Sequence, residues 1–410
     1  MSQQKCIFFF GITRFDAPVE STSYTLAKKL AENNLVYYIE YPFTFFDKLK
    51  YSQSAAFKLR TKSLSNNKGI ISSGIPNLHI VALPTVLSIH FLPEGQLYRR
   101  LLNYNESIIA KHLKNIIANN SLQNIIYINS WVFHYPNIAR YLKPKLSIYH
   151  CVDPVFTPYD AKHGLVSENI LINQSSLIIC TSQQLYREKI RINANTHFIP
   201  NAADIVHCVQ ATNPELPIHP SLNNIPKPII GYFGNIERRM DYELIREVAL
   251  KNRNMSFVFA GPIEKHLVPD YLFDITNVYF TGRVPYNEMP NMVKGFDAAI
   301  IPFKRTMEST TVFPLKLFEY LGAGKPVIAS NFNMDLKSFT DDLVVYCDSA
   351  EQFSCAINDA LVVDSVQLQN KRIELARQHT WERRAFDFEF LIDKQLAIES
   401  KLLDVKEINQ

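Results

Sequence analysis

The stretch that decides the fold is PLKLFEYLGAGKPVIAS, at residues 314–330. A proline at a first helical position prepares the backbone for helix entry, and the free amides of that turn, with the helix dipole, make an anion site. Glu319 follows about one and a half turns later, where its carboxylate can accept hydrogen bonds from ribose hydroxyls. Gly322 and Gly324 end the helix and permit a tight return into a strand. The stretch predicts a nucleotide-binding unit, although an ordinary helix and strand with an exposed glutamate fits the pattern as well.

Apolar runs of strand length alternate with helical segments on both sides of this stretch, which is typical of parallel sheets with crossover helices. In the first half we expect strands at 6–10, 36–39, 79–83, 125–128, 146–149, 177–180 and 197–199, and helices at 21–31, 96–118, 163–174 and 183–190. In the second half we expect strands at 229–233, 256–260, 278–280, 298–301, 326–329 and 343–346, and helices at 242–251, 287–294, 314–321 and 351–361. The pattern predicts an α/β protein with two Rossmann-like domains in series.

The boundary between these domains is predicted from proline content. Residues 211–228 are rich in proline and have little periodicity, so they read as a stiff linker. The amino-terminal domain would then span 1–210 and the carboxy-terminal domain 229–380. A helical segment at 381–410 would follow and return to one of the domains, which we expect to be the amino-terminal one.

Composition limits the class of protein. With 410 residues and 47% apolar content, the chain can bury two cores. A net charge of +4 is far below that of a dedicated nucleic-acid binder. The six cysteines form no C-x-x-C pair, which favours a reducing cytoplasm over a zinc site or a disulfide framework. No apolar run approaches the roughly 20 residues that span a bilayer, so we expect a cytoplasmic protein, at most peripheral on the inner face of the membrane.

One compositional oddity is the stretch 48–68, which holds six Lys or Arg and no Asp or Glu. Such a stretch can draw a protein to anionic lipids. Tyr51, Phe57 and Leu59 interleave the charges and favour an interfacial contact. A solvated mobile loop fits the composition as well.

The wider phrase FPLKLFEYLGAGKPVIAS resembles the donor-site signature of retaining GT-B glycosyltransferases of family 4, in particular the bacterial surface-polysaccharide branch. Four further blocks match in order: GYFGNIERRMDYELI (231–245), FVFAGP (257–262), VYFTGRVPYNEMP (278–290) and FDAAIIPF (296–303). The amino-terminal half matches more weakly, through SIYHCVDP (147–154) and FIPNAAD (198–204). The resemblance implies a GT-B fold in which an acceptor domain and a donor domain face each other across a cleft.

The resemblance also assigns residues to the donor. Glu319 would hold the ribose, and the backbone at Arg283 and Val284 would meet the base. Contacts to the diphosphate would come from two places: the turn after the strand 229–233, and the loop before the helix that carries Glu319. The residues are Gly234, Asn235, Thr310, Thr311, Phe313, Pro314 and Leu315.

Positive charge would stabilise the leaving diphosphate in place of a metal ion. Arg238 and Arg239 occupy the family's arginine region, although adjacent arginines on an exposed turn are also common. The usual nearby lysine is missing; Lys316 would replace it or else point to solvent. Thr311 stands where a glutamate is frequent, eight positions before Glu319, which leaves the identity of the sugar open, and the neighbouring Glu308 is a weak substitute.

On the acceptor side, the strand that ends at Gly11 leads into a turn at 12–20, at the strand edge where open α/β sheets bind ligands. Arg14 and Asp16 are candidates in that turn. His150 and Asp153 follow the strand 146–149, where a histidine can bind a sugar hydroxyl or move a proton. A histidine merely satisfied at a strand end fits the sequence equally well.

The resemblance implies transfer of a sugar, with a hexose as the typical cargo, from a nucleoside diphosphate to a hydroxyl of a glycan or lipid-linked glycan. Retention of configuration and independence of any metal or cofactor are expected, and nucleic acid is not an expected partner. A sugar-nucleotide epimerase of the same fold would convert the donor without an acceptor. A catalytically silent scaffold of a polysaccharide-synthesis complex, suggested by Thr311 and the missing lysine, would bind no nucleotide.

Overall fold

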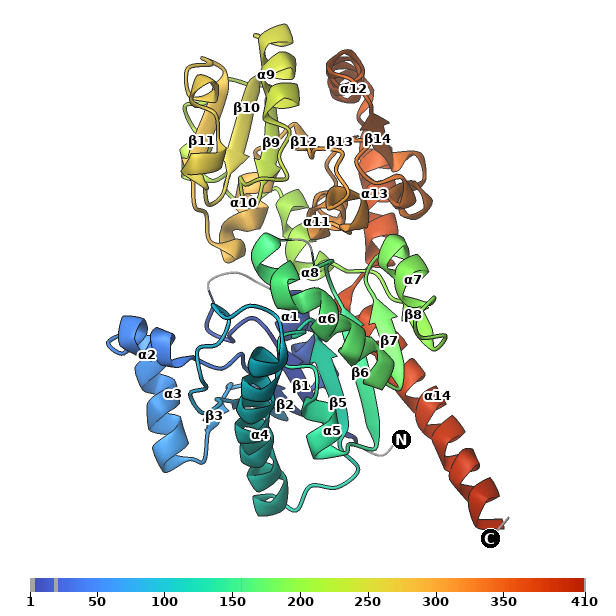
Figure 1. Cartoon of the computed structure of the whole chain (residues 1–410). Helices are drawn as coiled ribbons and strands as arrows, with labels where there is room; N and C mark the ends of the chain where they lie inside the picture. The colour runs from blue at the N-terminus through green and yellow to red at the C-terminus, as the bar shows by residue number, and fades with distance from the viewer. Residues whose placement is uncertain (1–3, 18–20, 156, 409–410) are drawn as a thin grey trace. The chain divides into compact units, whose positions relative to one another are not determined.

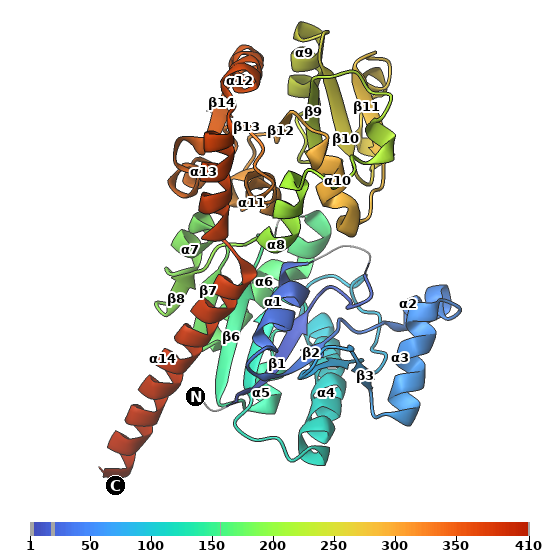
Figure 2. The ribbon, with the colours of Figure 1, turned by 180° about the vertical axis from the view of Figure 1, so that it is seen from behind.

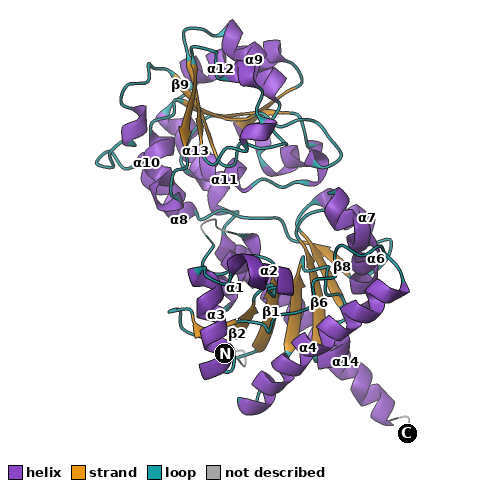
Figure 3. Cartoon of the chain, turned by 60° about the vertical axis from the view of Figure 1, so that its left-hand side comes forward, coloured by secondary structure: helices purple, strands orange, loops and turns teal. Residues whose placement is uncertain are grey.

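The computed structural model describes residues 4–17, 21–155 and 157–408, with side chains described as far as Lys401. The chain forms two compact units. Unit 1 comprises Met1–Pro200 and Arg384–Gln410, and unit 2 comprises Asn201–Arg383. In each unit, helices lie on both sides of one sheet (Figure 3). The expected α/β architecture with two parallel-sheet domains is confirmed.

The sheet of unit 1 has eight strands in the order β3-β4-β2-β1-β5-β6-β7-β8. Their bounds are β1 (Cys6–Gly11), β2 (Leu35–Ile39), β3 (Ile70–Ser72), β4 (Leu78–Val81), β5 (Ile126–Ser130), β6 (Leu146–Cys151), β7 (Leu177–Cys180) and β8 (Thr196–Phe198). Neighbouring strands are parallel except β3 and β4, which are antiparallel. The link at residues 73–77 is too short for a crossover, which explains this exception.

Helices cover both faces of this sheet because alternate side chains of its strands point to opposite sides. Phe8 and Phe10 of β1 pack with Leu102 and Ile109 of α4. Figure 1 shows α4 and α6 over this face, and Figure 2 shows α1 and α14 over the other. The helices of unit 1 are α1 (Thr22–Leu30), α2 (Phe45–Tyr51), α3 (Ala55–Asn66), α4 (Gln96–Asn119), α5 (Ile138–Leu142), α6 (Pro158–Gln174), α7 (Gln183–Lys189) and most of α14 (Trp381–Ile408).

The last helix, α14, packs on unit 1 through polar and aromatic contacts. Lys5 Nζ lies 2.9 Å from an Asp393 carboxylate oxygen, and Asn195 Nδ2 donates to Gln395 at 3.0 Å. Of the helices that the structure describes, neither α14 nor any other combines the length and the apolar composition needed to cross a membrane.

Residues 48–68 belong mainly to α2 and α3, so the interpretation as a mobile loop is wrong. The reason is tertiary. Arg60 of α3 is buried and pairs with Glu40 and Asp16, each at 2.7 Å, and the Phe57 ring packs edge-on against Phe43. These partners lie outside the basic stretch, where composition alone could not reveal them.

Unit 2 has six parallel strands in the order β11-β10-β9-β12-β13-β14. Their bounds are β9 (Ile229–Phe233), β10 (Ser256–Ala260), β11 (Val278–Gly282), β12 (Ala298–Ile301), β13 (Val327–Ser330) and β14 (Val344–Cys347). The α-helices are α8 (Ile205–Cys208), α9 (Tyr242–Lys251), α10 (Met289–Lys294), α11 (Leu315–Gly322), α12 (Ala350–Val363) and α13 (Val366–Arg377). The chain adds β10 and β11 on one side of β9 and then β12 to β14 on the other, so the strand order reverses between β9 and β12.

The proline-rich segment 211–228, predicted to be a stiff linker between the domains, belongs to unit 2 and packs against it. Lys294 Nζ donates to the carbonyls of Asn213 and Pro214, both at 2.7 Å. The buried Leu222 side chain packs so closely on Gly295 that a Cβ there would lie 2.4 Å from Leu222 Cδ1. Proline lacks an amide proton but keeps its carbonyl, so such a segment can still be held by donors from a neighbouring helix.

Candidate functional site

In open parallel sheets, ligands bind at the carboxyl ends of the strands, at the point where the strand order reverses. Unit 2 has this point between β9 and β12. Unit 1 has it between β1 and β5, where Gly11 pairs with Ser130. Most of the side chains predicted from the sequence follow strand ends at these two edges.

The end of β9 in unit 2 is built from glycines because backbones approach each other closely there. Gly234 N–H donates to the Ala260 carbonyl at 2.9 Å. A Cβ on Gly261 would lie 2.0 Å from the Gly234 carbonyl oxygen, and both glycines have positive φ, +145° and +151°. Only glycine fits these positions without strain. The turn after β9 therefore presents open backbone at the edge of the sheet.

Lys316 lies across the same edge. Its Nζ is 5.2 Å from the Tyr232 ring centroid and 5.5 Å from that of Phe303, and a Cβ on Gly234 would lie 3.0 Å from it. The alternative that Lys316 points to solvent is therefore wrong. Burial, followed by the charge of Arg239, lowers the pKa of the amine to about 8. No ion pair of this amine is found among the described residues, and the charges of Glu319 and Glu237 offset the effect of burial only in part.

The two arginines lie in the loop that follows Gly234. Backbone bonds from Asp241 to Pro302 (2.8 Å) and from Lys304 to Arg239 (2.7 Å) tie this loop to the end of β12. The Arg239 guanidinium pairs with Glu237 and lies 5.7 Å from the Phe303 ring that Lys316 also faces. The structure thus brings Lys316 and Arg239 to one ring at the strand edge.

Arg238 is less buried and pairs with Glu308, with 3.0 Å between Nη2 and Oε1. Its side chain is 48% exposed and that of Glu308 17% exposed. Glu308, considered a weak substitute for the missing glutamate, is thereby held next to a predicted site arginine.

Glu319 of α11 is held by Tyr286, whose hydroxyl donates to Oε1 at 3.2 Å. His207 Nε2 in turn donates to the Tyr286 carbonyl at 2.9 Å. Burial raises the pKa of the Glu319 carboxyl, and the charge of Lys316 opposes that shift. Sequence reasoning missed Tyr286 as a site residue, although it lies within the block at 278–290.

The loop before α11 is fixed by hydrogen bonds. The Thr311 hydroxyl donates to the Glu308 carbonyl at 2.6 Å, and the Thr310 hydroxyl to the Met307 carbonyl at 2.8 Å. Two asparagines that the sequence did not single out brace it further: Asn201 donates to Phe313 O and Asn333 to Val312 O, both at 3.0 Å.

The start of α11 has no side-chain cap. Pro314 is the residue before the helix and not its first helical residue, and its side chain makes no cap. The backbone amides of Leu315 and Lys316, at the start of the helix, therefore receive no hydrogen-bond acceptor from the side chain of the capping residue. An anion at this end would satisfy them and interact favourably with the helix dipole.

The remaining predicted donor residues also follow strand ends. Arg283 and Val284 come directly after β11; Arg283 is exposed and Val284 is buried. Asn235 is exposed, and its carbonyl accepts a hydrogen bond from the Tyr232 hydroxyl at 2.9 Å. Because β9, β10 and β11 are parallel neighbours, these residues lie along one edge of the sheet.

In unit 1, the end of β1 is crowded: a Cβ on Gly11 would lie 2.3 Å from the Tyr38 hydroxyl. The Arg14 guanidinium packs 3.9 Å from the Phe43 ring centroid. Its Nε is buried and has no hydrogen-bond partner among the described residues. Arg14 is therefore the predicted acceptor-side residue that best fits an anionic or hydroxylated ligand.

Asp16 has a structural role. Hydrogen bonds from Arg60 to its carboxylate, at 2.7 and 2.8 Å, lower the pKa of this group. The carboxylate thus anchors α3 to the turn after β1. Asp16 thus positions the turn, and its contact with an acceptor stays a prediction.

His150 is also corrected. It is 1% exposed, its Nδ1 lies 2.9 Å from the Ser130 hydroxyl, and the Phe388 ring of α14 covers it at 5.1 Å. Burial lowers its pKa to about 3. A side chain so enclosed cannot touch a substrate, so the simpler interpretation, a histidine satisfied at the end of a strand, holds. The covering helix lies far away in the sequence, which is why the sequence could not reveal it.

Asp153 stays half-buried in the loop after β6. Its carbonyl accepts the Trp131 indole N–H at 2.5 Å. This bond holds Trp131, which has a positive φ of 60°, at the end of β5. Asp153 and His150 therefore do not form a catalytic pair.

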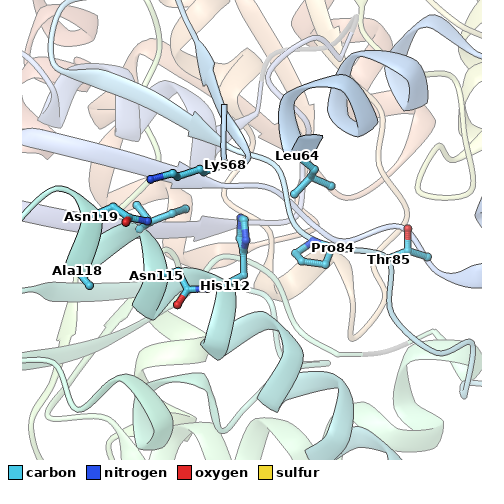
Figure 4. A pocket seen from close by; sticks show the side chains of 9 residues that line it. Leu64, Lys68, Pro84, Thr85, His112, Asn115, Ala118 and Asn119 are labelled. Atoms are coloured by element: carbon cyan, nitrogen blue, oxygen red, sulfur yellow. The ribbon is translucent and has the colours of Figure 1, made fainter. Parts of the chain in front are cut away.

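A separate cavity of about 730 Å³ lies in unit 1 between the end of α3, the loop after β4 and α4 (Figure 4). The labelled side chains of Lys68, His112 and Asn115 border it. None of the predicted donor or acceptor residues lines this cavity, although Leu64 and Lys68 belong to the basic stretch 48–68. Among the described residues, no group of three or more His, Cys, Asp or Glu side chains forms a metal site.

The part of unit 2 that forms this edge of the sheet also matches a known protein family. Residues 227–362 match the family model Glycosyl transferases group 1. The chain is also 28% identical over 200 residues to a protein of Bacillus subtilis (strain 168) named "Putative teichuronic acid biosynthesis glycosyltransferase TuaH". That match covers 45% of this chain and 50% of TuaH, so the aligned part spans about half the length of this relative.

Solved structures confirm the GT-B fold. Sucrose-phosphate synthase from Thermosynechococcus elongatus aligns with a TM-score of 0.67 at 14% identity, over 96% of this chain and 100% of that one. The E. coli trehalose-6-phosphate structure bound with UDP-2-fluoro glucose aligns with a TM-score of 0.66 at 10% sequence identity, over 96% of this chain and 99% of that one. Anabaena HepE in complex with UDP and glucose aligns with a TM-score of 0.61 at 14% sequence identity, over 95% of this chain and 100% of that one.

We expect the free energy of unfolding to fall as the pH drops from about 6.5 towards 3. The unfolded chain protonates its histidines near pH 6.5, whereas His134 and His150 stay neutral in the fold because burial lowers the pKa of each to about 3. Each adds a slope of about 1.4 kcal/mol per pH unit in this window. Urea unfolding at neutral and acidic pH measures it. The His150→Gln variant should lose the part of this pH dependence that His150 contributes. The His266→Gln variant, which replaces an exposed histidine, should keep the full pH dependence of the native chain. Equal slopes in both variants would contradict the burial of His150.

Proposed function

We propose that this protein is a glycosyltransferase that moves a sugar from a nucleoside diphosphate to a hydroxyl of a glycan or lipid-linked glycan. The observation that carries the proposal is the Lys316 amine, which faces the same ring as Arg239, together with the start of α11, which has no side-chain cap. The family match at 227–362 supports the same activity. So do the nucleotide-sugar and UDP complexes among the structural neighbours.

The chemistry of this proposal is charge stabilisation. When the bond between the sugar C1 and the diphosphate oxygen breaks, negative charge grows on the diphosphate and positive charge on the sugar. Lys316, Arg239 and Arg238 would neutralise the diphosphate, and the first amides of α11 would donate hydrogen bonds to it. The acceptor oxygen then bonds to C1 and gives up its proton to an oxygen of the departing diphosphate. Since these groups are already in position, little reorganisation would be needed.

The nucleoside would be held by Glu319. Tyr286 occupies one carboxylate oxygen and fixes its direction, which leaves the other to accept from ribose hydroxyls. The exposed Arg283 and the backbone of Val284, after β11, would meet the base. Thr311 lacks the carboxylate that related sequences offer to the sugar at this position, and it donates its hydroxyl to the backbone, which leaves the identity of the sugar open.

The acceptor would meet unit 1. Arg14 offers a cationic group with a free Nε beside the reversal point of the sheet. Polysaccharide biosynthesis is the setting we propose, because TuaH is named for teichuronic acid biosynthesis. Retention of configuration and a hexose as the sugar rest on the resemblance of residues 313–330 to retaining hexosyltransferases.

Replacement of Glu319 tests the donor site. A thermal-shift panel of nucleoside diphosphates and nucleotide sugars should raise the melting temperature of the native chain for one base. Glu319→Ala should then lower the affinity for that ligand by about tenfold to a hundredfold, because hydrogen bonds to a charged group contribute about 1.5–3 kcal/mol each. Glu247→Ala, which removes an exposed carboxylate from α9, is the matched control. Unchanged affinity in Glu319→Ala would remove this residue from the site.

The affinity for the nucleoside diphosphate should fall as the pH rises above about 8, because Lys316 then loses its charge. An anion favours the protonated amine, so binding near this pH should take up protons. Calorimetry in buffers of different ionisation enthalpy measures the uptake. Lys316→Met should abolish it, and Lys251→Met, on the exposed side of α9, should not. A pH-independent affinity in the native chain would contradict this role.

We also propose that turnover needs no metal ion, since three basic side chains would stabilise the leaving group. Activity should be undiminished by excess chelator and should fall sharply in Arg239→Gln. A strict requirement for Mg²⁺ or Mn²⁺ would contradict this part of the proposal and would leave the proposed nucleotide site untouched.

A further inference from the structure

The helix α2 presents large apolar side chains to solvent. Phe45, Phe46 and Leu49 are 50%, 63% and 79% exposed, and no residue of α2 is buried. Leu49 follows Phe45 by four positions and Phe46 by three, so the three side chains share one face of the helix. Neighbouring apolar groups this open to water indicate a surface that meets a partner.

Exposed lysines accompany this apolar face. Lys48 and Lys50 flank it on α2, and Lys58 and Lys62 belong to the adjoining helix α3; all four are exposed. The carboxylate of Asp47, next to the basic stretch, accepts the Thr44 amide at 2.8 Å and caps α2. The α2–α3 hairpin (residues 45–66) therefore combines apolar and cationic groups, and its single carboxylate is engaged in the cap.

The hairpin is held firmly at its base. The buried Arg60 pairs with Glu40 and Asp16, and Phe57 packs on Phe43. These contacts use the inner side of α3 and leave its lysines and the whole of α2 outside. Figures 1 and 2 show α2 and α3 at the outer margin of unit 1. The exposed face is thus fixed to the unit and does not depend on a later folding step.

We propose that the α2–α3 hairpin docks on the surface of an anionic phospholipid bilayer. Phe45, Phe46 and Leu49 would enter the interface, while the lysines contact headgroup phosphates. The choice of a lipid surface over a protein groove rests on charge, because the excess of lysines complements a continuous negative surface. The docking needs only the side chains of the hairpin, and it rests on the proposed function solely in bringing the enzyme to a lipid-linked acceptor.

Vesicle sedimentation with the full chain tests this proposal. The native protein should bind vesicles of phosphatidylcholine mixed with phosphatidylglycerol much more than phosphatidylcholine alone, and added salt should weaken binding. The double variant Phe46→Ser/Leu49→Ser should lose about tenfold or more of its partition, because it removes apolar surface that would enter the interface. Lys48→Gln/Lys50→Gln should lose most of the preference for phosphatidylglycerol.

Matched controls come from exposed groups elsewhere. Val362→Ser/Val363→Ser removes side chains of α12 that are 84% and 64% exposed, and Lys111→Gln/Lys114→Gln removes exposed charges of α4; both should bind vesicles like the native chain. A nucleotide thermal shift, unchanged in every variant, separates failure of docking from failure of the proposed function.

Three results would overturn the proposal: equal binding to both kinds of vesicle, hairpin variants that partition like the native chain, or hairpin variants that lose only self-association in light scattering. The last result would identify a second copy of the chain as the occupant of this face.

Discussion

The charge of Lys316 is the constraint from which the proposed activity follows. Its amine lies against Tyr232 and Phe303 without an ion-pair partner among the described residues, at the point where the strand order of unit 2 reverses. The nearby carboxylates of Glu319 and Glu237 offset the cost of burying this cation only in part, because burial still lowers the pKa of the amine. A bound anion would recover more of that free energy, which is why we propose a diphosphate rather than a neutral ligand at this edge of the sheet.

The surroundings of Lys316 keep this arrangement fixed. The glycines at the ends of β9 and β10 bring their backbones too close for any side chain, so the amine can lie over Gly234. The Tyr320 hydroxyl accepts from the Phe233 amide at 2.7 Å and donates to its carbonyl at 3.2 Å, which ties α11 to the end of β9. A shift of α11 would therefore disturb Glu319, Lys316 and the end of the strand together.

Much of the fold could be predicted from sequence, because apolar strands and periodic helices are local signals. The strands 229–233 and 256–260 and the helix 242–251 agree with the structure at every boundary. The misses share one cause, which is dependence on distant partners. Arg60 is held by Glu40 and Asp16, the segment 211–228 is held by bonds from Lys294, and His150 is covered by Phe388 of α14. In the site, the sequence pointed to Lys316 and Glu319, but their directions depended on neighbouring strands.

The measurement that tests the central claim most directly is a crystal structure of the full chain with a bound nucleoside diphosphate. The account predicts that the diphosphate contacts the Lys316 amine and the first amides of α11, with a ribose hydroxyl on Glu319. A diphosphate bound elsewhere, for example in the cavity beside His112, or a Lys316 amine that stays without an anionic partner in the complex, would contradict it.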